Sequence, residues 1–342
     1  MATKNSSRGA RPSGLPPAFR PALSVSPANV GHYIFAFLLL AGVSGAQTRY
    51  TPPKTPDGQP DLQGVWTNVT ITPLERPAEF AGKAFLTPQE AAAYEKRFLQ
   101  TTNADRRDGG EDADLGRAYN DAWYDRGTKV VRTLRTSLII DPPDGKIPPL
   151  TPQAQKIQDE LREAARGHQF DGPENRSLAE RCLLWATAGP PMLPSFYNNN
   201  YQIVQTKNSV MILVEMIHEA RIIPLDGRPH VASNVRQWMG NPVGHWEGNT
   251  LVVETTNFSD KTRFRGADEN LRLTERFTRT APDMIMYEFT VNDPTAFTKP
   301  WTAQIPMTQT QGPIYEYACH EGNYALADVL AGARAQEKEG SR

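Results

Sequence analysis

Two ionisable side chains are expected on otherwise apolar strand faces, where an acid and a base could act together. Side chains of a strand point alternately to its two faces. In the stretch that ends at Phe277, this alternation puts Glu275 on the apolar side with Leu271 and Leu273. Burial without a partner disfavours the charged carboxylate and raises its pKa. Glu275 is therefore a candidate for acid–base chemistry.

A strand is also predicted over residues 210–223, and its apolar face carries His218. The opposite face of this strand carries Glu215 and Arg221. We predict a pocket in which His218 and Glu275 are the catalytic acid–base pair, while Glu215 and Arg221 contact the ligand. The structural alternative is a hydrogen-bonded core histidine, together with a carboxylate that pairs with an arginine or a backbone donor.

Histidines in the second half of the chain offer a competing, metal-dependent chemistry. Of the five histidines that follow residue 46, four lie there: His218, His230, His245 and His320. Zinc and similar ions take three or four such ligands. The HExxH and HxH spacings are absent, so we predict no cofactor and keep a metal-dependent hydrolase or lyase as the alternative.

Aromatic residues provide a third kind of surface. Tyr201 follows a run of asparagines, Trp246 precedes a turn, and Tyr287 lies on the apolar face of a strand predicted over 284–291. Rings beside amides can bind sugars or flat molecules, although core packing explains the same residues. We predict that Tyr201, Trp246 and Tyr287 belong to the ligand site, and that the ligand is lipid-like, aromatic or sugar-derived.

Several common catalytic motifs are missing from the chain. It contains no GxSxG elbow, no P-loop and no GxGxxG sequence, which disfavours serine hydrolases, NTPases and dinucleotide enzymes. The sequence therefore leaves open whether the protein is an enzyme. A non-catalytic interaction module is the third class that remains.

Short strands separated by turn residues must position these side chains. Strands are predicted at 64–67, 137–140, 201–206, 210–223, 250–258, 271–280, 284–291, 301–308 and 314–319. Helices are predicted over 87–100, 151–166 and 175–186, and the first two open with a threonine cap followed by proline. This spacing favours a mainly β (α+β) fold: an antiparallel β-barrel or curled β-sandwich. We expect one domain over 64–335 with a helical insertion at about 85–186, and Gly64-x-Trp66 is a lipocalin-like hint.

The first 46 residues are predicted to be a signal peptide with a long n-region. Basic residues at positions 4, 8, 11 and 20 precede an apolar run at 33–46, which is shorter than the roughly 20 residues that span a bilayer. Ser44 and Ala46 provide small residues for cleavage before Gln47, and a proline-rich leader follows over 47–63. We expect a periplasmic or extracellular protein without a stable membrane anchor after cleavage.

Charge and cysteine content narrow the expected partners. The signal segment carries four of the 37 basic residues and none of the 38 acidic ones, so the mature chain has a formal charge of −5. Such a chain has no overall field that attracts nucleic acid, and we expect a small-molecule ligand instead. The two cysteines, Cys182 and Cys319, predict a disulfide in an exported protein.

Five segments together resemble a family of uncharacterised exported proteins from environmental bacteria. They are Pro60 to Thr67, Ala179 to Trp185, Glu215 to Arg221, Gly244 to Val253 and Tyr315 to Tyr324. The resemblance runs from about Asp57 to Ala335 and implies secretion and a shared fold. It implies no activity and no catalytic residues.

Overall fold

The computed structural model describes residues 50–115 and 120–340. The predicted signal peptide and the start of the leader lie outside the described residues. The strands are β1 Gly64–Thr67, β2 Ile139–Asp141, β3 Asn200–Gln205, β4 Ser209–Val214, β5 Ala220–Pro224, β6 Asn241–Glu247, β7 Thr250–Thr256, β8 Arg272–Ala281, β9 Met284–Asn292 and β10 Trp301–Thr310. The α-helices are α1 Pro88–Thr102, α2 Gly110–Leu115, α3 Pro152–Ala165 and α4 Ala325–Gly340.

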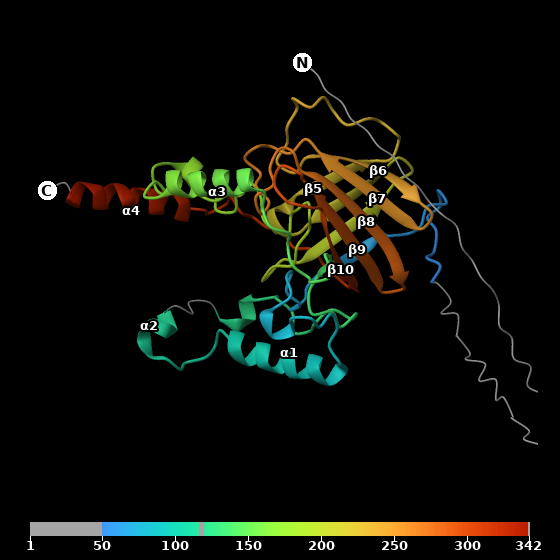
Figure 1. Ribbon diagram of the computed structural model, residues 1–342, viewed down its shortest axis with the longest axis horizontal. Coiled ribbons are helices and arrows are strands. Elements are labelled where there is room, and N and C mark those ends of the chain that lie inside the picture. Colours follow the sequence, from blue (N-terminus) through green and yellow to red (C-terminus); the bar gives the residue numbers. More distant parts are fainter. Residues whose placement is uncertain (1–49, 116–119, 341–342) are drawn as a thin grey trace, which may run out of the picture. The chain divides into compact units, whose positions relative to one another are not determined.

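All ten strands belong to one antiparallel sheet, which confirms the predicted mainly β (α+β) class. The order along the sheet is β5-β4-β3-β1-β10-β9-β8-β7-β6, and β2 pairs with β10 beside this path. Figure 1 shows the run from β10 to β6 as neighbouring, twisted strands. The hydrogen-bonded neighbours on this run follow one another in sequence, as in a meander, while β1 joins the two halves of the sheet between β3 and β10.

The sheet curls until its two ends approach each other. Arg221 on β5, the first strand of the order, pairs with Glu275 on β8, the seventh. A Cβ atom added to Gly244 on β6 would lie 2.7 Å from Cγ2 of Ile223 on β5. The Ile223 side chain on the first strand therefore packs closely against the backbone of Gly244 on the last.

The barrel alternative is nevertheless wrong, because β5 and β6 are not hydrogen-bonded neighbours in the described sheet. Pro224 ends β5 and Pro242 lies near the start of β6, and proline has no amide hydrogen to give to a ladder. We call this line of contact between β5 and β6 the seam. The fold is a single curled sheet that stays open at the seam.

Large side chains fill the concave side of the curl. Seven aromatic residues are among its largest fully buried members: Trp66, Trp301, Tyr201, Tyr287, Phe258, Phe277 and Phe289. The alternation predicted for β8 and β9 is confirmed, with Leu273, Phe277, Ile285 and Phe289 all buried. Small closed or curled sheets are normally filled by side chains in this way, so the interior is a packed core.

The long strand predicted over 210–223 is wrong. It is a hairpin: β4 ends at Val214, a turn follows, and β5 begins at Ala220. Ile217 and His218 in the turn have φ values of 65° and 57°. The turn shifts the alternation, so Arg221 faces the core and Ile222 is 54% exposed. An apolar run gives no local sign of such a turn, because its usual glycine, proline and asparagine signals are absent.

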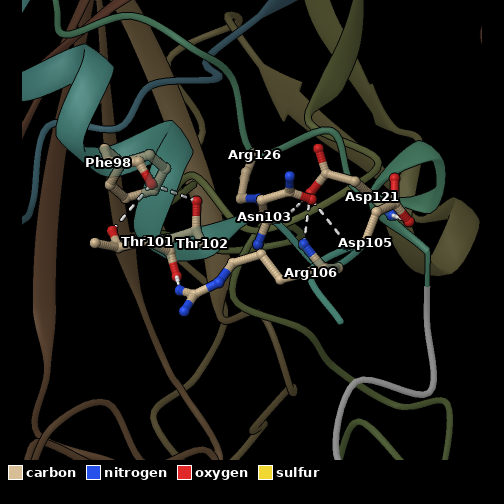
Figure 2. Close-up of polar contacts among 9 residues, drawn as sticks. Phe98, Thr101, Thr102, Asn103, Asp105, Arg106, Asp121 and Arg126 are labelled. Carbon is tan, nitrogen blue, oxygen red and sulfur yellow. Dashed lines mark hydrogen bonds and ion pairs between the residues drawn. The ribbon is translucent and has the colours of Figure 1, made fainter. Parts of the chain in front are cut away.

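The helical insertion contains α1, α2 and α3, and its capping pattern agrees with the prediction. The Thr87 hydroxyl accepts from the Glu90 amide while the Glu90 carboxylate accepts from the Thr87 amide, a complete capping box. At the other end of α1, the Thr101 and Thr102 hydroxyls donate to the carbonyl of Phe98, as Figure 2 shows. The capping box satisfies backbone amides that the helix start leaves free.

The segment after α1 is held by an aspartate. Asp121 Oδ1 accepts from the Ala104 amide at 3.2 Å and from the Arg126 guanidinium, while the Asp121 amide donates to Asp105 Oδ1 (Figure 2). The contacts connect the chain before and after α2. This arrangement is a local scaffold on the described surface and brings no nucleophile or metal-ligand set together.

Two other expectations fail. Residues 175–186 form turns after a short 3-10 helix, Pro173–Asn175, and residues 314–319 form no strand. Strand β6 and helix α4 were not predicted. Positive φ at Cys182 and the dense Gly-Pro-Pro sequence that follows oppose a regular helix in the first segment.

The predicted disulfide between Cys182 and Cys319 is confirmed. It joins the segment before β3 to the chain after β10 across 137 positions of sequence. A structural disulfide indicates an oxidising compartment outside the cytoplasm. Among the described residues, no helix combines the length and apolar composition that crossing a membrane requires.

Candidate functional site

Glu275 lies at the centre of a buried polar cluster rather than beside a histidine. Its carboxylate accepts from both terminal nitrogens of Arg221, with Nη1 to Oε1 at 3.1 Å. The Tyr287 hydroxyl donates to Oε1 at 2.7 Å. Glu275 and Tyr287 are fully buried, and Arg221 is 3% exposed. A bidentate Arg–carboxylate pair of this kind neutralises both charges inside the core.

The cluster continues from the sheet to the chain segment before β3. The amide of Met192 donates to the Tyr287 hydroxyl at 3.0 Å, and its carbonyl accepts from Asn68 Nδ2. The Tyr201 hydroxyl accepts from Asn68 and donates to the carbonyl of Thr187. Side chains from the sheet thus anchor the backbone at both Thr187 and Met192.

The charge states of this cluster are held by its own geometry. Burial alone would lower the pKa of Arg221, but the charge and hydrogen bonds of Glu275 outweigh burial and raise it. Burial raises the pKa of the Tyr287 hydroxyl well above its usual value and also raises the pKa of Tyr201. Both hydroxyls therefore stay protonated and Arg221 stays charged at physiological pH, so Arg221 and Tyr287 are fixed hydrogen-bond donors to Glu275.

The structure does not bring His218 to Glu275. His218 is exposed in the β4–β5 turn, outside the apolar face predicted for it. Glu275 occupies the predicted face of its strand. Its partner is Arg221, which was predicted on the face of strand 210–223 opposite His218. Proton transfer requires both groups to reach the reacting atom, and a fully enclosed carboxylate has no such access here. The catalytic roles of His218 and Glu275 stay predictions that this geometry does not favour.

The predicted ligand-binding residues occupy separate places. Tyr201 and Tyr287 are core residues of the buried cluster, and half-buried Trp246 packs against the core from β6. Glu215 is buried in the β4–β5 turn, where Oε2 accepts from Asn200 and Oε1 accepts from the Tyr315 amide. Glu215 thereby attaches the chain after β10 to the hairpin.

The metal alternative finds no support in the described residues. Within them, no group of three or more histidine, cysteine, aspartate or glutamate side chains is placed to hold an ion. His230 instead contacts Asn241, and His245 contacts Glu247 on its own strand. His218 and His320 lie in exposed or half-exposed turns.

A surface hollow of about 440 Å³ has the most apolar lining of the hollows described for this structure, which makes it the strongest candidate site for an organic molecule. One wall is the segment 178–193, and the other is the loop 262–264. Its largest lining side chains are Leu178, Leu184, Trp185, Leu193, Arg263 and Phe264. We call it the aromatic hollow. Its volume and mainly apolar lining are typical of small-molecule sites.

Both walls of the aromatic hollow are attached to rigid parts of the fold. Phe264 stacks on the buried Trp301 with ring centres 6.0 Å apart. Trp185 donates from Nε1 to the Ser195 hydroxyl and meets Phe196 edge to face. Gly189, with φ of 55°, lets the backbone fold closely here, because an added Cβ would lie 2.7 Å from the backbone of Pro191. Half-buried rings held in this way present preformed faces.

A second hollow, of about 400 Å³, lies along the seam. Glu219, Arg221 and Ile222 line it from the β5 side, and Trp238 and Asn241 line it from the other. Burial raises the pKa of Glu219. This hollow is mixed in polarity, and the Arg221 guanidinium beneath it is already occupied by Glu275. The aromatic hollow is therefore the better candidate.

The comparisons with known proteins give no class for this fold and site. No protein-family model, no curated protein and no solved structure matches the chain.

The residues of the aromatic hollow were missed as site residues. Trp185 is one of six tryptophans in the chain that could contribute to an aromatic ligand surface, but no pattern selects it, and Arg263 and Phe264 carry no periodic signal. The sole hint was the proline-rich stretch around Pro190 and Pro191, since turn-forming segments often carry binding surfaces. No spacing rule connects residue 185 with residue 264, because the folded core brings their segments together.

Proposed function

We propose that the protein is an exported small-molecule-binding protein whose ligand has an aromatic or lipid-like body. The observation that carries this proposal is the aromatic hollow: two anchored, half-buried rings and a lining that is almost wholly apolar. Exposed apolar concavities on a folded surface commonly mark ligand sites. The buried polar cluster supports the site by fixing the backbone at Thr187 and Met192, within the wall segment.

Binding is favoured over acid–base catalysis by the arrangement of the ionisable groups. The residues that line the aromatic hollow include no carboxylate and no histidine, so a bound molecule there meets no proton acceptor. Glu275 is enclosed and its carboxylate accepts three hydrogen bonds. This combination suits retention of a ligand rather than its conversion.

The binding test uses N-phenyl-1-naphthylamine, a neutral aromatic dye that fluoresces when it leaves water. In the full-length protein, Trp185→Leu is expected to weaken dye binding about three- to tenfold, because an aromatic contact contributes about 0.5–1.5 kcal/mol. Trp123→Leu is the matched control, since Trp123 is 70% exposed and lies outside the hollow. Equal dye affinity for wild type and Trp185→Leu would overturn the proposal.

Export has its own test. A disulfide and an apolar run at 33–46 behind basic residues support it. After expression in a bacterium, the protein recovered outside the cytoplasm is expected to begin at Gln47, as read by N-terminal sequencing. Leu39→Arg, which interrupts the apolar run, should retain the uncleaved chain inside. An intact N-terminus on exported wild-type protein would contradict the predicted cleavage.

A further inference from the structure

The aromatic hollow contains a single charged lining residue, Arg263. Its guanidinium group has no carboxylate or hydrogen-bond partner among the residues that the structure describes. Two other arginines near this loop are paired within the described part of the chain, Arg236 with Glu269 and Arg162 with Asp159, whereas Arg263 and Arg265 are not, and only Arg263 of these two lines the aromatic hollow. An arginine left unpaired beside apolar walls is available for an anion from outside the protein.

The backbone on both sides of Arg263 is fixed. The Thr262 hydroxyl donates to the carbonyl of Trp238 at 2.8 Å, and the Phe264 ring stacks on Trp301. The backbone of Arg263 is therefore anchored on both sides, by hydrogen-bonded Thr262 and by packed Phe264. Its side chain is exposed, so a ligand can reach the guanidinium without opening the core.

Arg263 borders two hollows, and their linings differ in charge. A hollow of about 500 Å³ on the other side of Arg263 is lined by α3 and by Asp268 and Glu269. Glu269 in this lining is paired with Arg236, and the lining Arg162 is paired with Asp159, which leaves Asp268 to repel an anion there. The lining of the aromatic hollow has no carboxylate. An anionic group that meets Arg263 is therefore best placed with its apolar body on the Trp185 and Phe264 side.

We propose that the aromatic hollow selects amphiphilic anions: molecules with an apolar body against Trp185 and Phe264 and one carboxylate or sulfonate group on Arg263. This proposal rests on the proposed function and adds the charge of the ligand to it. The guanidinium offers two parallel donors, which match the two oxygens of a carboxylate or sulfonate.

Two dyes with the same aromatic body test the charge. 1-Anilinonaphthalene-8-sulfonate is N-phenyl-1-naphthylamine with an added sulfonate. Arg263→Gln is expected to weaken binding of the sulfonate dye about tenfold and to change binding of the neutral dye by less than twofold. Arg263→Lys should recover part of the lost affinity for the sulfonate dye. Added salt should weaken binding of the sulfonate dye only in the proteins that carry a charged residue at position 263.

Arg265→Gln is the matched control, because Arg265 is exposed and lies outside the aromatic hollow. Competition by dodecanoate against dodecanol, and by naphthoate against naphthalene, then separates lipid-like from aromatic bodies. The charge proposal is overturned if Arg263→Gln binds both dyes with wild-type affinity, or if it loses affinity for both dyes by the same factor. Failure of Trp185→Leu to affect the neutral dye instead overturns the proposed function, so the two failures are distinguishable.

Discussion

Replacing Glu275 with alanine is expected to lower the free energy of unfolding by about 3–5 kcal/mol. Glu275 is fully buried, and its removal leaves the Arg221 guanidinium charged and enclosed without a counter-ion. The Tyr287 hydroxyl loses its acceptor at the same time. For a chain of this size, the loss corresponds to a fall in melting temperature of about 6–10 °C, measurable by calorimetry.

A matched double variant distinguishes the effect of an unpaired charge from the effect of lost side-chain volume. Arg221→Met with Glu275→Leu removes both charges and keeps apolar volume, so it is expected to recover most of the lost stability. Glu275→Gln is a milder single change that keeps the shape and an acceptor for Tyr287. If Glu275→Ala melted like wild type, the ion pair between β5 and β8 would not be what the structure describes. If the double variant were as unstable as the single one, an unpaired charge would not be the cause.

Removing the disulfide by Cys182→Ser with Cys319→Ser is expected to lower stability by up to about 5 kcal/mol. The bond closes a loop of 137 positions, and chain-entropy arguments give roughly this value for a loop of that length. The chain after β10 also has few other attachments: Glu215 holds the Tyr315 amide, and α4 has no buried residue. The variant gains freedom in this segment, which offsets part of the loss.

Urea unfolding with and without reductant measures this effect. Wild-type protein in reductant should match the double serine variant, and the variant itself should not respond to reductant. Limited proteolysis should cut the variant first within 312–340, while the sheet stays intact. An unchanged unfolding midpoint after reduction of wild type would contradict the expectation.

The Glu275 variant and the disulfide variant act on the proposed binding site in different ways. Cys182 belongs to the wall segment of the aromatic hollow, and Tyr287 holds the same segment through Met192. Loss of the disulfide frees one end of the segment, whereas loss of Glu275 removes the partner that orients the Tyr287 hydroxyl. The segment is thus held from two sides, which explains how a proline-rich stretch can present a rigid wall.

Much of the fold could be read from residue patterns. Alternation in β8 and β9 identified the buried faces, and the threonine cap before α1 identified its start. These signals are local, because side-chain direction along a strand and hydrogen bonds at a helix end depend on residues a few positions apart. The disulfide was predicted from the presence of only two cysteines in a chain with a predicted export signal.

The candidate site depends on contacts that no local pattern contains. Arg221 meets Glu275 because an unmarked turn reverses the chain at residues 215–219 and the sheet curls, which also leaves His218 outside. Trp185, Arg263 and Phe264 share a surface because a buried cluster anchors one wall and Trp301 anchors the other. The sequence by itself determined the class of fold, the buried faces of its strands and the cysteine pair, since each follows from neighbouring residues or from composition. Only the tertiary structure decided which charges pair and where a hollow remains, since both depend on how far the sheet curls and what fills it.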